Sequence, residues 1–325
     1  MSTPSDWEIP QHAQPKQEDW GFDLERVLAA VVTLRATIPA DAFTAGTLGT
    51  ERAGNGVLIR DDGLVLTIGY LITEAESIWI NTNDGRALPG HALAYDQETG
   101  FGLVQALGRV NLPALPLGRS ARVRAGERVV VAGGGGRARA IAARVAAKQE
   151  FAGYWEYLLD EAIFTSPAHP NWGGAALITG EGALAGIGSL HLQQGRDNGP
   201  PEHLNMIVPI DLLPPILDDL LTLGAPKGPP RPWLGLYATE VEDKVVVAGL
   251  ANPGPARKAG LKMGDILLAV GGAEIGDLAA LYRGIWRSGA AGAKVQLLIY
   301  RDGRTIDIDV KSADRGGFLK SPSLH

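Results

Sequence analysis

The stretch GNGVLIRDDGLVLTIG (54–69) joins two β-rich runs through the pair Asp62-Gly63. An Asp-Gly pair between apolar runs is typical of a β-hairpin, because glycine readily adopts the positive φ that a tight turn needs. The stretch SIWINTNDGRAL (77–88) repeats this design around Asp84-Gly85. Similar short runs continue to about residue 208. Many short strands at this spacing predict a closed antiparallel β architecture.

Composition narrows the classes of function. The 325 residues are enough for two or three domains, and 45% hydrophobic with 20% charged residues is typical of globular protein. The net charge of -6, without a run of Lys or Arg, argues against nucleic acid as a partner. The chain has no cysteine, and its six histidines lack metal-ligand spacing. We therefore expect no disulfide, no metal site and no cofactor.

The first residues are polar and acidic, without the basic and apolar regions of a signal peptide. The apolar runs are too short or too interrupted to span a bilayer, so we expect no integral membrane segment. These features predict a cytoplasmic location, or a periplasmic one if the annotated start of the chain is wrong.

The chain is expected to contain two domains. The stretch GAPKGPPRP, rich in Pro and Gly, can hold neither a helix nor a central strand and so marks a boundary. Residues 1–23 form an N-terminal arm that is predicted to be flexible, with Trp7 and Trp20 either docking a partner or packing back on the domain. The predicted pieces are the arm (1–23), a β domain (24–223), the linker (224–232), an α/β module (233–313) and a tail (314–325).

The α/β module contains ANPGPARKAGLKMGDILLAVGGAEI (251–275). Pro255 suits the first turn of a short helix, Gly260 suits its left-handed end, and Gly264-Asp265 turns the chain into an apolar strand. This run resembles the core of a PDZ domain of bacterial protease type. Such domains add a peptide as an extra strand and bind its terminal carboxylate with backbone N–H groups.

The resemblance implies a peptide site in this module. Its carboxylate-binding loop would be Trp233, Leu234, Gly235 and Leu236, with Arg231 adding charge and Tyr282 of the helix Asp277–Ser288 nearest the groove. The alternative is that these loop residues only pack between domains and bind no peptide.

The β domain resembles the HtrA/Deg-type serine proteases along LVLTIGYLITEAESIWINTNDGRALPGHALAYDQETGFGLVQ (64–105) and IFTSPAHPNWGGAALITGEGALAGIGS (163–189). The resemblance implies a mainly β fold, a trypsin-like double antiparallel β-barrel followed by an α/β PDZ domain. Aligned with the family pattern, Tyr70, Gly100 and Trp172 occupy the positions of the catalytic His, Asp and Ser. The segment between Thr165 and Trp172 is also about two residues shorter than the pattern.

These three residues cannot perform acyl transfer, which needs a nucleophile, a base and a group that orients the base. Tryptophan has no nucleophilic oxygen, and a tyrosine, with its ordinary pKa near 10, is a poor base at neutral pH. The sequence therefore predicts a pseudoprotease that acts as a scaffold or adaptor, binding partner C-termini or extended segments by β-augmentation at the PDZ groove.

Two alternatives stay open. One is a serine endopeptidase of the HtrA class with unconventional residues, for which Ser166, Ser189, His169 and His191 are the candidates. The other is an ATP-independent holdase chaperone. The resemblance also implies assembly, as a trimer or as a subunit of a hetero-complex, with Trp7, Trp20 and Phe22 as possible anchors.

Overall fold

The computed structural model describes residues 7–196 and 199–321, which divide into two units. Unit 1 comprises the described residues up to Gln149, then Glu161–Lys227, and those from Lys320 on; unit 2 comprises Glu150–Asp160 and Gly228–Leu319. The division near residue 228 falls inside the Pro/Gly-rich stretch of the sequence. The assignment of Glu150–Asp160 to unit 2 has no counterpart in the domain boundaries expected from the sequence.

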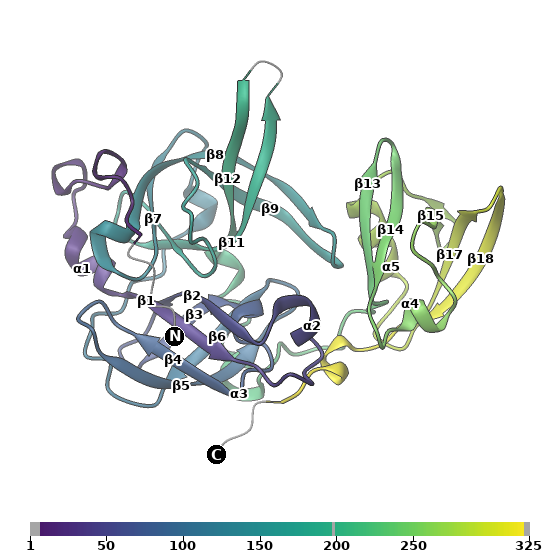
Figure 1. Cartoon of the computed structure of the whole chain (residues 1–325), viewed down its shortest axis with the longest axis horizontal. Coiled ribbons are helices and arrows are strands. Elements are labelled where there is room, and N and C mark those ends of the chain that lie inside the picture. The colour runs from purple at the N-terminus through teal and green to yellow at the C-terminus, as the bar shows by residue number, and fades with distance from the viewer. Residues whose placement is uncertain (1–6, 197–198, 322–325) are drawn as a thin grey trace. The chain divides into compact units, whose positions relative to one another are not determined.

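Unit 1 contains two closed antiparallel barrels of six strands each (Figure 1). In the first, the Asp62-Gly63 turn lies between paired strands as predicted, and Gly63 has a φ of 91° that favours glycine. The first barrel has the order β1-β2-β3-β6-β5-β4, made of β1 (Val31–Thr37), β2 (Glu51–Leu58), β3 (Leu64–Ile68), β4 (Ser77–Asn81), β5 (Ala87–Tyr95) and β6 (Phe101–Ala106).

The second barrel has the order β10-β11-β12-β9-β8-β7. Its strands are β7 (Arg128–Ala132), β8 (Ala140–Gly153), β9 (Tyr157–Ser166), β10 (Ala176–Ile178), β11 (Leu184–Arg196) and β12 (Gly199–Pro209). The helices of unit 1 are short: α1 (Leu24–Ala29), α2 (Ala45–Leu48) and α3 (Leu217–Leu223).

Unit 2 is a sheet of order β13-β14-β15-β17-β18, with β16 paired to β15. The helix α5 (Leu278–Arg287) starts at Asp277, whose side chain accepts a hydrogen bond from the Ala280 N–H, as an N-cap should. Leu278, Leu281 and Ile285 of α5 are buried in the core of the unit. The remaining elements are β13 (Leu236–Val241), β14 (Lys244–Leu250), α4 (Pro255–Lys258), β15 (Ile266–Val270), β16 (Ala273–Glu274), β17 (Lys294–Arg301) and β18 (Arg304–Lys311).

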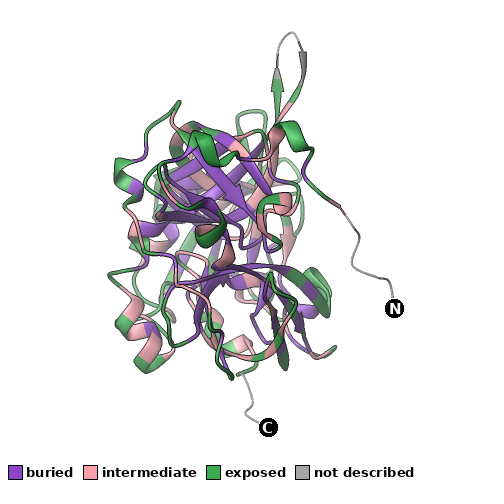
Figure 2. Cartoon of the chain, turned by 90° about the vertical axis from the view of Figure 1, so that its left-hand side faces the viewer, coloured by how far each residue is buried: buried purple, intermediate pink, exposed green. Residues whose placement is uncertain are grey.

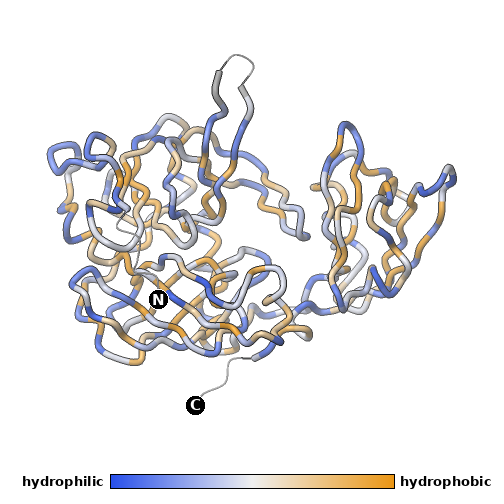
Figure 3. Tube along the Cα trace, in the orientation of Figure 1, coloured by the Kyte–Doolittle hydropathy of each residue, from blue (hydrophilic) through white to orange (hydrophobic). Residues whose placement is uncertain are grey.

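The mainly β fold class predicted from the sequence is confirmed, with two barrels followed by an α/β module. Buried segments concentrate in the strands and exposed ones in the connections (Figure 2). The hydropathy of the chain follows the same division, with apolar residues along the strands and hydrophilic ones in the loops (Figure 3). Within the described ranges, no helix is long and apolar enough to cross a membrane.

The N-terminal arm differs from the flexible segment that the sequence predicted. Over its described part, residues 7–23, it packs on unit 1: Ile9 is buried in the core of the second barrel, and its N–H donates to the carbonyl of Ala138. Trp7 lies against His169 and under the guanidinium of Arg139. Its tryptophans therefore pack back on the domain, which was the alternative expectation.

Candidate functional site

The three positions that replace a catalytic triad come together in unit 1. Tyr70 lies in a 3-10 turn (Gly69–Leu71) that follows β3, and the Gly69 N–H donates to the carbonyl of Gly100 at 2.7 Å. The phenol of Tyr70 interacts with the side chain of Trp172 and lies against Gly173, the next residue along the chain. The fold thus preserves the juxtaposition of the three positions while changing all three side chains.

The surroundings of Tyr70 prevent its phenol from acting as a base. Its hydroxyl donates to the carbonyl of Ser189 at 2.9 Å. Burial raises the pKa of Tyr70 above its ordinary value and outweighs the interaction with the Trp172 side chain, which lowers it. A phenol that is protonated and already donating to a carbonyl cannot accept a proton from a nucleophile at neutral pH.

Trp172 occupies the nucleophile position with an indole. Its ring lies 5.2 Å from the ring of His191, which stacks in turn on His203 at 5.0 Å. The indole N–H is the only hydrogen-bonding group of a tryptophan side chain, and it is a donor. This position therefore offers neither a nucleophile nor a free acceptor.

The oxyanion site is also altered, at Pro170. In serine proteases of this fold, the N–H of the nucleophile and that of the residue two before it bind the oxyanion. The residue two before Trp172 is Pro170, and a proline nitrogen carries no hydrogen. One of the two backbone donors is therefore missing whatever the conformation of the loop.

Buried amide side chains hold the loop around Pro170. Asn205 binds both backbone groups of His169: its Oδ1 accepts from the N–H at 2.6 Å, and its Nδ2 donates to the carbonyl at 3.1 Å. Asn55 Nδ2 donates to the carbonyl of Asn171 at 2.9 Å. Asn55 and Asn205 are fully buried, so the backbone on both sides of Pro170 is fixed.

The serines and histidines that could form a substitute site have other roles. Ser166 Oγ donates to Glu202, and Ser189 is a residue of β11 whose carbonyl accepts from Tyr70. His169 is buried, with Nε2 against the carbonyl of Arg139 at 2.9 Å and Nδ1 accepting from the Asn171 N–H at 3.1 Å. Burial lowers the pKa of His169 and that of His191. His169 is therefore a buried structural histidine of the loop, and His191 is a histidine of β11 that stacks on His203.

In unit 2, the predicted carboxylate-binding loop does bind a carboxylate, and it belongs to this chain. The N–H groups of Leu234, Gly235 and Leu236 donate to the side chain of Glu156 at 2.7 to 3.2 Å. Glu156 is 6% exposed. The sequence analysis missed this residue, because nothing in its neighbourhood distinguishes it from an ordinary hairpin glutamate.

Of the other residues of the predicted peptide site, Tyr282 and Trp233 are buried in unit 2 and Arg231 is exposed. Tyr282 is fully buried, and its hydroxyl donates to the carbonyl of Gly153 at 2.6 Å. Trp233 pairs with Ala313 through two backbone hydrogen bonds and lies against Phe318. The guanidinium of Arg231 lies 4.3 Å from the centroid of the Trp286 ring.

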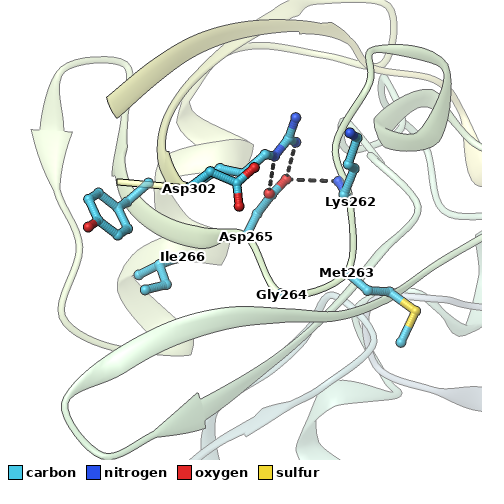
Figure 4. Close-up of a pocket in the computed structure, with 8 residues that line it drawn as sticks. Lys262, Met263, Gly264, Asp265, Ile266 and Asp302 are labelled. Carbon is cyan, nitrogen blue, oxygen red and sulfur yellow. Dashed lines mark hydrogen bonds and ion pairs between the residues drawn. The ribbon is translucent and has the colours of Figure 1, made fainter. Parts of the chain in front are cut away.

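A concavity of unit 2 lies beside Asp265 (Figure 4). Arg301 binds both oxygens of this carboxylate, at 2.5 and 2.6 Å, and the Lys262 N–H donates to it at 2.8 Å. Although burial opposes it, Arg301 keeps the pKa of Asp265 below its ordinary value. This carboxylate is therefore part of a structural ion pair with Arg301. Across the described residues, no group of three His, Asp or Glu side chains is arranged to hold a metal ion.

Comparisons with known proteins agree with this architecture. Residues 54–187 match the trypsin-like peptidase domain family, and residues 232–312 match the PDZ domain family. A probable periplasmic serine endoprotease DegP-like of Hahella chejuensis is 27% identical over 296 residues, 84% of this chain and 60% of the relative. A protein of the same name from Pseudomonas putida is 30% identical over 282 residues, 80% of this chain and 55% of the relative. The chain therefore spans little more than half the length of these relatives.

Solved structures share the fold. The HtrA-type protease AlgW with tripeptide has a TM-score of 0.52 at 22% identity, covering 92% of this chain and 97% of its own. The serine endoprotease from Yersinia pestis has a TM-score of 0.51 at 21% identity, covering 90% of this chain and 96% of its own.

These comparisons correct one expectation. The cytoplasmic location inferred from the polar N-terminus is contradicted, because the relatives in Hahella and Pseudomonas are named periplasmic. With a trypsin-like domain, a PDZ domain and DegP-like relatives along most of its length, the chain belongs to the HtrA/Deg-type family.

Proposed function

We propose that this chain is a non-catalytic member of the HtrA/Deg-type family that binds partner proteins through the peptide groove of its PDZ domain. The observation that carries the proposal is the side-chain pair at the places of the base and the nucleophile: Tyr70, whose hydroxyl already donates to the carbonyl of Ser189, and the adjacent indole of Trp172. Pro170 supports it independently, since it removes a backbone donor that a protease needs for its oxyanion. The PDZ domain keeps a loop of N–H groups directed at a carboxylate, which supports binding as the retained activity.

Incubation with fluorogenic casein tests the absence of catalysis. We expect the full chain to release no more fluorescence than buffer, because none of the three triad positions supplies its chemistry. The control is the same assay on variants with Ser166, Ser189, His169 or His191 replaced by alanine. Turnover that any one of these replacements abolishes would identify a substitute nucleophile or base and end the proposal.

The second candidate is a serine endopeptidase, which the names of the relatives favour. A fluorophosphonate probe separates the two candidates without any assumption about substrate, since it labels an activated serine hydroxyl directly. Labelling of the native chain, lost on heat denaturation, would favour the peptidase. An unlabelled native chain would favour the binding protein.

A further inference from the structure

The turn between β8 and β9 places a carboxylate in the PDZ loop. Glu156 has a φ of 58°, in the left-handed region that non-glycine residues rarely adopt. One of its oxygens accepts from Leu234, Gly235 and Leu236, and the other accepts from Leu234 as well. Three successive backbone N–H groups therefore converge on one side-chain carboxylate, the arrangement expected for the terminal carboxylate of a bound peptide.

The backbone before Glu156 follows the edge of the sheet. β13 is the terminal strand in the sheet order, so its outer edge is open to pairing. The Ala238 N–H on this edge donates to the carbonyl of Tyr154 at 2.9 Å. Tyr154 thus lies beside residue 238 while Glu156 lies beside residue 235, so the segment runs antiparallel to β13, with its carboxylate at the loop.

Side chains on both sides of the turn secure it within unit 2. Leu158 is 8% exposed and belongs to the same buried cluster as Leu234, Leu236 and Tyr282. Arg283 of α5 forms ion pairs with Glu150 and with Asp160, the latter at 2.6 Å. The ring of Tyr154 lies 6.0 Å from that of Tyr237. The segment therefore supplies three features by which an extended peptide would be recognised: the apolar side chain of Leu158, the paired carbonyl of Tyr154 and the carboxylate of Glu156.

We propose that the turn Tyr154–Glu156 is a built-in ligand of the PDZ groove, which a partner must displace. Resting on the proposed function, this inference adds its regulation: the groove is closed in the isolated chain and opens when the turn leaves. One set of three N–H groups cannot bind two carboxylates, so occupation by Glu156 and by a partner is mutually exclusive. The partner is a chain end with a free carboxylate and an apolar last residue.

Fluorescence polarisation with a labelled decapeptide ending in Tyr-Trp-Leu tests this competition on the full chain. We expect Glu156→Ala, which removes the side chain from the loop, to bind the peptide at least about tenfold more tightly than the natural chain, because the apparent affinity rises with the fraction of open grooves. A second variant, Glu150→Ala with Asp160→Ala, weakens only the flanking ion pairs and should bind up to about fivefold more tightly. The control Glu161→Gln alters an exposed residue of the same hairpin and should bind like the natural chain.

The amide hydrogen exchange of residues 234–236 supplies an independent readout. We expect slow exchange in the natural chain and faster exchange in Glu156→Ala, since the N–H groups lose their acceptor. Equal peptide affinity in the natural and Glu156→Ala chains, or fast exchange in the natural chain, would overturn the inference. Slow exchange that depends on Glu156, with no peptide bound by any variant, would support the built-in ligand and refute peptide binding as the proposed function.

The acidity of Glu156 predicts a pH dependence. Burial raises the pKa of Glu156 to about 7, although the N–H donors and the charge of Arg315 lower it. A carboxyl group with a raised pKa in the closed form binds a proton more tightly there than in the open form, so closing strengthens as pH falls. The charged and ionisable groups near Glu156 are Arg315 and Tyr282, with Glu240 beyond Tyr282.

Peptide affinity of the natural chain should therefore drop on the order of tenfold between pH 8 and pH 6. The affinity of Glu156→Gln should stay constant over the same range, because the group that titrates is gone. An equal slope in both chains would assign the pH effect to the peptide or to another residue.

Discussion

Replacing Tyr70, Gly100 and Trp172 together by His, Asp and Ser is expected to leave the chain almost inactive against casein. The three side chains return, but Pro170 still lacks the N–H of the second oxyanion donor. Loss of one such donor lowers kcat by about 10²–10³-fold. A four-residue variant that adds Pro170→Gly should therefore exceed the three-residue variant by about this factor in kcat/KM.

The loop around Pro170 is held in place, so another N–H group cannot easily replace the missing oxyanion donor. Asn205 holds both backbone groups of His169, and Asn55 holds the carbonyl of Asn171, so neighbouring N–H groups cannot easily rotate into the missing place. Casein hydrolysis by the purified variants measures the effect, with Pro170→Gly alone as the control that should remain inactive. Equal rates in the three-residue and four-residue variants would show that Pro170 does not limit catalysis.

The replacement of the three triad residues was predictable because it lies in local patterns. Tyr70 and Trp172 each lie beside residues that match the family pattern, so each substitution is visible without a structure. The two barrels were predictable for the same reason, since Asp-Gly turns between apolar runs specify hairpins locally. Pro170 could have been recognised from the spacing alone, once the position of the nucleophile was aligned.

The built-in ligand was not predictable, because it depends on contacts between distant parts of the chain. Glu156 and Gly235 are 79 positions apart, and neither position carries an unusual local signal. A similar limit applies to Asp211–Leu223, where the spacing of Leu212, Ile216, Leu220 and Leu223 is typical of one continuous helix. That helix is interrupted, with a 3-10 turn at Ile210–Leu212 and α3 starting only at Leu217, because Pro214 and Pro215 cannot donate the backbone hydrogen bonds of a continuous helix. Asp211 accepts a hydrogen bond from the Ala121 N–H instead of capping a helix.

Glu74 is the residue of unit 1 whose removal is expected to cost most stability. It is buried, and its carboxylate accepts hydrogen bonds from the N–H groups of Phe43, Thr44 and Lys320 and from the hydroxyl of Thr44. Through the Thr44 hydroxyl it is connected to the buried guanidinium of Arg52, at 2.8 Å from that hydroxyl. Burial opposes the ionised form of Glu74, but these hydrogen bonds outweigh it and lower the pKa of the carboxyl group.

Glu74→Ala should therefore lower the free energy of unfolding by about 3–5 kcal/mol, the cost of leaving a buried charge and several donors without their partner. Urea denaturation of the full chain measures the change, and Glu76→Ala, an exposed glutamate two residues further on, is the matched control with a cost within about 0.5 kcal/mol. Because the folded pKa of Glu74 is lowered, its contribution is present above the ordinary pKa of a glutamate and is lost as pH falls through the acidic range. The loss of unfolding free energy caused by Glu74→Ala should accordingly become smaller in acid. A loss that is small at neutral pH, or that does not change with pH, would show that Arg52 and the Thr44 hydroxyl are satisfied without this carboxylate.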